Sequence, residues 1–117
     1  MGRGTPRRSR AWCLQRLKGG VIQLTRTAAL EYAAAGIRVN AVCPGSIDTP
    51  MLARLLHERP ELEGRLAALH PLGRIGEADE VAQAVIWLCS DAASFVTGQV
   101  LTIDGGLSAG DAPGTWQ

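Results

Sequence analysis

Hydrophobic residues begin to recur at helical spacing only after Lys18. Five apolar positions then fall on one face of a helix, and this face is expected to pack: Val21, Leu24, Ala28, Tyr32 and Ala35. Alanines on the remaining surface favour helix and would allow another helix to approach closely. Gly36 suits the left-handed residue that ends many helices. The pattern therefore predicts a helix over residues 19–35.

Two segments have the apolar, β-branched character of strands. Residues 37–43 (Ile-Arg-Val-Asn-Ala-Val-Cys) are mostly apolar, so we expect a strand that is buried on both faces and stops at Pro44-Gly45. Residues 99–103 (Gln-Val-Leu-Thr-Ile) form the second predicted strand, and Asp104-Gly105-Gly106 ends it. The sequence thus predicts two strands.

The region between these strands reads as helical. A loop over 46–50 is followed by short helices around Met51–Leu56 and Leu62–Leu69, and a connector over 71–76 leads to a helix that starts with Glu77. Carboxylates at the start of that helix suit the positive end of its dipole. Helix, strand, helices and strand in this order predict an α/β fold, a parallel sheet with right-handed crossovers. With about two strands and three to five helices, we expect an incomplete sheet.

Composition narrows the class of protein. The chain has 117 residues, 46% of them hydrophobic, and a net charge of +1, which gives no reason to expect a nucleic acid or membrane partner. No apolar run approaches the roughly 18 residues of a membrane span. Cys13, Cys43 and Cys89 are far apart and lack histidines at ligand spacing, so we expect no metal site and a reducing, cytoplasmic location.

The two ends of the chain lack periodicity. Residues 1–17 are rich in arginine and free of acidic residues, which can indicate a transit peptide or a nucleic-acid arm. Gly2, Gly4 and Pro6 argue against the amphipathic helix of a transit peptide, and we expect an irregular or disordered segment. Residues 110–117 are expected to form a frayed tail.

Four motifs in order resemble the C-terminal half of a short-chain dehydrogenase/reductase. They are Lys18-Gly19-Gly20-Val21, the run from Arg38 to Pro50, Gly73-Arg74-Ile75-Gly76, and Phe95 to Gln99 with Asp104-Gly105-Gly106. The resemblance covers residues 18–109 and is nearest to 3-oxoacyl-carrier-protein reductases and to sugar or cyclic-alcohol dehydrogenases. It implies the C-terminal portion of a Rossmann-like, doubly wound domain, whose substrate lid corresponds to helices over 51–69.

The same resemblance implies roles for particular residues. In the family a Tyr-x-x-x-Lys pair acts on the carbonyl or alcohol, and four-residue spacing puts both side chains on one helical face. Lys18 matches the lysine, which also holds the nicotinamide ribose, but Leu14 occupies the tyrosine position. Tyr32 lies almost four turns further along and cannot substitute. The resemblance assigns Pro44, Gly45 and the backbone of Ile47 to the nicotinamide side of NAD or NADP, with Thr49 bonding the carboxamide.

Other conspicuous residues have plainer interpretations. Asn40 and the Asp104-Gly105-Gly106 turn are expected to be structural. His57 and His70 lie in polar, proline-flanked connectors, where a surface position is expected. Cys43 and Cys89 are interpreted as small apolar residues.

Two functional hypotheses follow. The first is a fragment of an NAD(P)-dependent oxidoreductase that moves hydride between nicotinamide and a secondary alcohol or ketone. As written it is expected to be inactive, because it lacks the tyrosine and a glycine-rich turn for the pyrophosphate. The alternative is a non-catalytic interaction module that associates with full-length subunits. In the family the helix over 19–35 packs at a subunit interface, so a homo-oligomer through this helix is expected.

The genetic code offers an explanation for Leu14. Trp12 to Leu17 can be written TGG-TGC-CTA-CAG-CGC-CTC, and the same bases read one position later give Gly-Ala-Tyr-Ser-Ala, followed by serine. The family has this sequence before Lys-Gly-Gly. We therefore hypothesise that residues 1–17 are wholly or partly an out-of-frame reading, the alternative being a divergent N-terminus that matches by chance.

Overall fold

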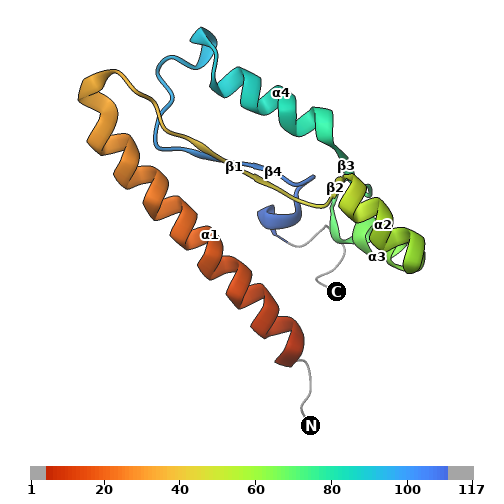
Figure 1. Cartoon of the computed structure of the whole chain (residues 1–117). Helices are drawn as coiled ribbons and strands as arrows, with labels where there is room; N and C mark the ends of the chain where they lie inside the picture. The colour runs from red at the N-terminus through yellow and green to blue at the C-terminus, as the bar shows by residue number, and fades with distance from the viewer. Residues whose placement is uncertain (1–4, 111–117) are drawn as a thin grey trace. The chain divides into compact units, whose positions relative to one another are not determined.

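The computed structural model describes the backbone of residues 5–110 and the side chains of residues 19–110. The chain, drawn in Figure 1, divides into two compact units. The first comprises Met1–Ala41 and Ser94–Val100, and the second comprises Val42–Ala93 and Leu101–Gln117.

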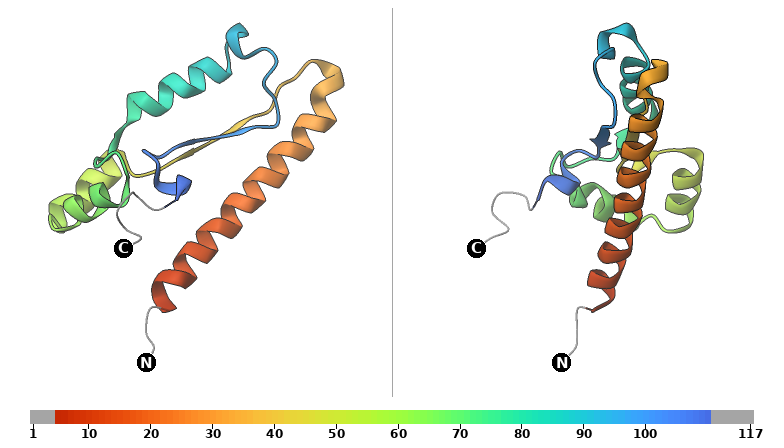
Figure 2. Two further views of the ribbon diagram at one scale, coloured as in Figure 1. Left: turned by 180° about the vertical axis from the view of Figure 1, so that it is seen from behind. Right: turned by 90° about the vertical axis from the view of Figure 1, so that its left-hand side faces the viewer.

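The first unit is built on one long helix. Helix α1 runs from Thr5 to Tyr32 and is the long helix in both views of Figure 2. The 3-10 helix η1 (Ala33–Ala35) extends it to Gly36, whose φ of 75° is left-handed as predicted. The irregular conformation expected for residues 1–17 is therefore wrong from Thr5 onward, and residues 1–4 lie outside the described backbone. Leu, Arg, Gln and Ala favour helix, and Pro6 lies in the first turn, where a proline breaks no helical hydrogen bond.

The buried face of α1 differs from the predicted one. Thr25 (6% exposed) and Ala29 (4% exposed) are its buried positions, while Leu24 of the predicted face is 71% exposed. The Thr25 hydroxyl donates to the Val21 carbonyl at 2.7 Å, which satisfies it without a partner from another element. Gly98 approaches Ala29 so closely that a Cβ at Gly98 would lie 3.4 Å from the Ala29 methyl. Small residues, and not the larger apolar ones, thus make the close contact.

The segment before the first strand pairs through side chains. The Asn40 amide donates to the Val96 carbonyl and its oxygen accepts from the Gln99 amide, both at 3.0 Å. The Val39 amide donates to the Thr97 hydroxyl at 3.1 Å. One backbone hydrogen bond also joins these segments, from the Gly98 amide to the Val39 carbonyl at 2.8 Å. Because side chains supply the other partners, strand β1 covers only Ala41–Pro44 and not the predicted residues 37–43. Asn40 is structural, as predicted.

Strands β1 and β4 (Val100–Ile103) form a two-stranded sheet. The hydrogen bonds from Ala41 to Gln99 and from Gly45 to Ile103, each 2.9 Å, advance along both segments in the same direction, so the pairing is parallel. The α/β class with parallel strands is confirmed. A second parallel pair joins β2 (Ile47–Asp48) to β3 (Gly76–Glu77), in segments predicted to be a loop and a connector.

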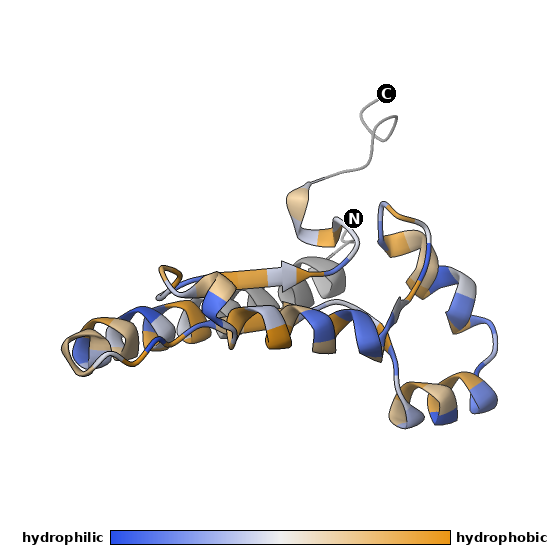
Figure 3. Ribbon diagram, turned by 90° about the horizontal axis from the view of Figure 1, so that it is seen from above, coloured by the Kyte–Doolittle hydropathy of each residue, from blue (hydrophilic) through white to orange (hydrophobic). Residues whose placement is uncertain are grey.

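The helices of the second unit follow the prediction closely. They are α2 (Pro50–Glu58), α3 (Leu62–Leu69) and α4 (Ala78–Leu88), with 3-10 helices η2 (Asp91–Ala93) and η3 (Leu107–Ala109). Each α-helix carries hydrophobic positions interspersed with hydrophilic ones (Figure 3). Leu88 and Ala93 are the buried apolar residues described in this unit.

Candidate functional site

The turn after β1 is closely packed. The Gly45 amide donates to the Ile103 carbonyl at 2.9 Å. A Cβ at Gly45 would lie 2.9 Å from the Asp104 Cα, the Asp104 Cβ and the His70 Nε2 atom, closer than real side chains come. Glycine is therefore required here for close approach.

Thr49 begins helix α2. It is the N-cap residue, and its Oγ1 accepts a hydrogen bond from the Leu52 amide at 3.2 Å, with Pro50 at the first helical position. A hydroxyl that accepts through its oxygen still carries a proton to donate. Thr49 can therefore cap the helix and donate to a carbonyl oxygen at the same time.

Four of the predicted site residues line one groove. Pro44, Gly45, Ile47 and Thr49 lie along a groove of about 580 Å³ in the second unit. The rest of its lining is Ser46, Met51, Leu52, Leu55, Leu66, Ala78 and Val81. Aliphatic side chains of α2 and α3 thus face the turn across a mainly apolar space, a typical composition for a small-molecule site.

Lys18, the remaining predicted site residue, lies in α1 of the first unit. Its side chain and that of Leu14 lie outside those that the structure describes.

His70 is buried, which corrects the surface position expected from its polar neighbours. It is 3% exposed, and its Nδ1 lies 2.7 Å from the Leu66 carbonyl oxygen, while its Nε2 accepts a hydrogen bond from the Ser46 amide at 3.2 Å. The Leu66 contact has helical i, i+4 spacing and could have been suspected from the sequence. The Ser46 contact spans 24 positions and leaves no local signal. His57 is exposed, as predicted.

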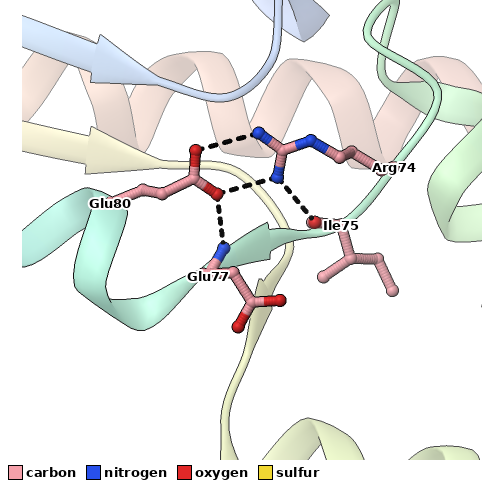
Figure 4. A network of polar contacts seen from close by, with 4 residues as sticks. All are labelled: Arg74, Ile75, Glu77 and Glu80. Carbon is pink, nitrogen blue, oxygen red and sulfur yellow. Dashed lines mark hydrogen bonds and ion pairs between the residues drawn. The ribbon is translucent and has the colours of Figure 1, made fainter.

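Arg74 joins the connector to the start of α4. Its Nη1 and Nη2 donate to the two carboxylate oxygens of Glu80 at 2.7 and 2.9 Å, and Nη1 also contacts the Ile75 carbonyl (Figure 4). Glu80 accepts from the Glu77 amide at 2.9 Å and completes a capping box. The hydrogen bond from Arg74, helped by the Glu77 amide, lowers the pKa of Glu80 from 4.5 to about 2.

The Asp104 turn is structural, as predicted. Its two carboxylate oxygens accept hydrogen bonds from the Gly106 and Ser108 amides at 3.1 and 3.0 Å. The Leu72 amide donates to the Gly105 carbonyl at 3.0 Å, which joins this turn to the segment after α3.

Among the residues that the structure describes, a metal cluster, a disulfide and a membrane-spanning helix are all absent. No group of three His, Cys, Asp or Glu side chains there could hold a metal ion. Cys43 and Cys89 form no disulfide. None of the helices described is both long and apolar enough to cross a membrane.

Comparison with known proteins identifies the family. Residues 7–108 match a family profile described as enoyl-(acyl carrier protein) reductase. The chain is 53% identical over 92 residues to 2,5-dichloro-2,5-cyclohexadiene-1,4-diol dehydrogenase of Sphingobium indicum, covering 79% of this chain and 37% of that protein. It is 52% identical over 92 residues to cis-4-hydroxycyclohexanecarboxylate dehydrogenase of Sinomonas cyclohexanicum, covering 79% and 36%.

A solved structure supports the same assignment. The structure described as ElxO with NADP bound superimposes with a TM-score of 0.73 at 38% identity, covering 80% of this chain and 38% of that one. The fold is thus α/β, with parallel strands that match part of a Rossmann-like domain. The chain belongs to the short-chain dehydrogenase/reductase family. It spans little more than a third of the length of the relatives named here.

Proposed function

We propose that this chain carries the nicotinamide-side and substrate-side half of an NAD(P)-dependent alcohol dehydrogenase or ketone reductase. The observation that carries the proposal is the groove in which Pro44, Gly45, Ile47 and Thr49 lie together. The Thr49 hydroxyl retains a proton for a carboxamide oxygen, and the rest of the groove is lined mainly by apolar side chains. These features fit a nicotinamide ring, which exchanges hydride with the substrate when it is bound.

The groove also suggests a substrate class. Its far wall is formed by Met51, Leu52, Leu55 and Leu66, which offer apolar contact and no charge. Two relatives carry the names of dehydrogenases for substituted six-membered rings. We therefore propose apolar cyclic secondary alcohols and their ketones as the substrate class.

Catalysis by this chain alone is not expected. Leu14 has no proton to transfer, and the chain has no glycine-rich turn for a pyrophosphate. Lys18 is proposed to be the lysine that binds the nicotinamide ribose in the parent enzyme. NADH and NADPH oxidation assays with cyclohexanone and related ketones should show no turnover, whereas titration with nicotinamide mononucleotide should shift the NMR signals of Gly45, Ile47 and Thr49. Measurable turnover would refute the inactivity, and unchanged signals would refute the site.

The missing tyrosine has a proposed origin in the DNA. If residues 1–17 are an out-of-frame reading, the bases across Leu14 and Gln15 should spell a tyrosine codon one position later. Sequencing the gene decides this, because any other triplet there refutes the hypothesis.

A second candidate function is association with full-length subunits of the same family, in the cytoplasm. The observation that favours it is the exposure of large apolar residues on α1, which include Val21, Leu24, Leu30 and Tyr32. Co-expression with a tagged full-length homologue should recover both chains, and L24E/L30E should abolish the association. Recovery that is unaffected by these substitutions would count against α1 as the interface.

A further inference from the structure

Both ring nitrogens of the buried His70 are occupied. A backbone amide can only donate, so the Ser46 amide requires a lone pair on Nε2. A backbone carbonyl can only accept, so the Leu66 oxygen at 2.7 Å requires a proton on Nδ1. The two partners therefore select one neutral tautomer of the imidazole.

Three segments of the second unit meet at the His70 side chain. Leu66 belongs to α3, Ser46 to the turn after β1, and Gly105 to the turn after β4, where a Cβ would lie 3.5 Å from the His70 Cβ. The His70 backbone takes part as well, because its amide donates to the Ala67 carbonyl and its carbonyl accepts from the Gly73 amide at 2.7 Å. The ring thus joins the end of α3 to the turn after β1, and the His70 Cβ packs beside the turn after β4.

His70 reaches the turn from behind the groove. It lines a smaller cavity of about 220 Å³, which Ser46 and Ile47 also line, and it is absent from the lining of the larger groove. A ligand in the groove would therefore contact the turn and not the imidazole. His70 can therefore influence a ligand in the groove only through the Ser46 backbone, to which it is hydrogen-bonded.

We propose that His70 is a positioning residue that fixes the Gly45–Ile47 backbone and couples it to α3, so that the cofactor turn and the apolar substrate wall keep a set spacing. The cofactor part of this inference rests on the proposed function. Removing the ring would leave the Ser46 amide without its acceptor and open space beside Gly45.

The hydrogen bond can be tested directly in the wild-type chain. An N–H···N bond transmits a scalar coupling between its two nitrogens, so ¹⁵N NMR should detect a coupling between the Ser46 amide and His70 Nε2. The ring should show the Nδ1–H tautomer, and His57 provides an exposed reference in the same spectrum. A missing coupling together with an Nε2–H ring would overturn the proposal without any substitution.

Variants test the positioning role. H70L removes both hydrogen bonds, and H70Q offers an amide oxygen and an N–H in their place. Ser46 amide exchange should be about tenfold faster in H70L, of the order expected for the loss of one buried hydrogen bond, and mostly restored in H70Q. H57L is the matched control and should leave the rate unchanged. Equal exchange in H70L and wild type would refute the role.

A second measurement separates this inference from the proposed function. Nicotinamide mononucleotide should bind more weakly to H70L than to wild type, H70Q or H57L. One outcome is that wild type fails to bind the mononucleotide while the nitrogen coupling and the Ser46 exchange rates behave as expected. In that case the proposed nicotinamide site is wrong, and the role of His70 in positioning the Gly45–Ile47 backbone is retained. If H70L binds as tightly as wild type, the link from His70 to the cofactor turn is wrong.

Discussion

Arg74 and Glu80 form a two-point ion pair, with Nη1–Oε1 at 2.7 Å and Nη2–Oε2 at 2.9 Å. Because Glu80 also accepts from the Glu77 amide, the pair connects the Gly-Arg-Ile-Gly connector to the first turn of α4. Both side chains are substantially exposed to solvent, so screening limits the contribution of the pair to stability. Its effect should nevertheless be visible as a dependence on pH.

Acid should weaken the second unit through Glu80. The pKa of Glu80 is about 2 in the fold against 4.5 in the free carboxyl, so its contribution is complete above pH 4.5 and is lost as the pH falls toward 2. Urea unfolding followed by circular dichroism between pH 2 and pH 7 should show this loss in wild type and less of it in E80Q. E31Q, in the first unit, makes the same charge change and is the control. Its stability should fall at low pH as much as that of wild type. Identical curves for E80Q and wild type would contradict the assignment.

A methyl group at Gly45 should destabilise the fold. The Cβ would meet His70 and Asp104 at 2.9 Å, and overpacking of this kind typically costs about 1–3 kcal/mol. The matched control is G64A in α3, where a Cβ meets nothing within 4 Å and alanine should gain about 0.5–1 kcal/mol. Urea unfolding of the two variants should therefore move in opposite directions. A G45A variant as stable as wild type would contradict the close approach of Gly45 to His70 and Asp104.

Loss of Asn40 should weaken the start of β1. N40L removes both hydrogen bonds to the 96–99 segment. The Val96 carbonyl keeps the hydrogen bond from the Arg38 guanidinium at 3.1 Å, so we expect the net loss typical of a hydrogen bond, about 0.5–1.5 kcal/mol. Q99A changes a neighbouring exposed side chain and should stay within about 0.5 kcal/mol of wild type. Comparable unfolding midpoints for N40L and Q99A would show that water replaces the Asn40 amide without loss.

Thr49 should affect both stability and nicotinamide binding. T49V keeps the shape of the side chain but removes the hydroxyl that caps α2, which typically costs about 1 kcal/mol. It should also weaken binding of nicotinamide mononucleotide, because the proton offered to the carboxamide is lost. T49S retains the hydroxyl and is the control for both measurements. Weaker stability with unchanged binding would limit Thr49 to its capping role.

The sequence predicted the positions of the helices and strands better than the contacts between them. Helices α2, α3 and α4 and strand β4 lie close to their expected positions, because apolar periodicity and the proline and glycine boundaries are local signals. Strand β1 is shorter than expected, since the hydrogen bonds of Asn40 come from a segment more than fifty positions away. The contact of α1 with Gly98 uses Ala29 and not a residue of the predicted face, because so close an approach admits only a small side chain.

Among the site residues, too, those marked by a local motif could be predicted and those that depend on distant contacts could not. Pro44, Gly45, Ile47 and Thr49 could be found from one contiguous motif, and the structure brings them to one groove. Their roles toward a cofactor stay predictions. His70 was missed because its polar, proline-flanked setting resembles a surface loop, whereas its burial depends on Ser46 and Gly105, which are distant in sequence.

The short β2–β3 pair has a consequence for how specificity could be altered. Ile47 pairs with Gly76, and the Gly76 amide donates to the Ser46 carbonyl at 2.9 Å, so backbone contact holds the two ends of the α2–α3 segment together. A segment with tethered ends can be exchanged for another of different length at a small entropic cost. Residues 49–75 therefore form a natural cassette for grafting, provided that a graft retains Thr49, Arg74 and the contact of His70 with Ser46.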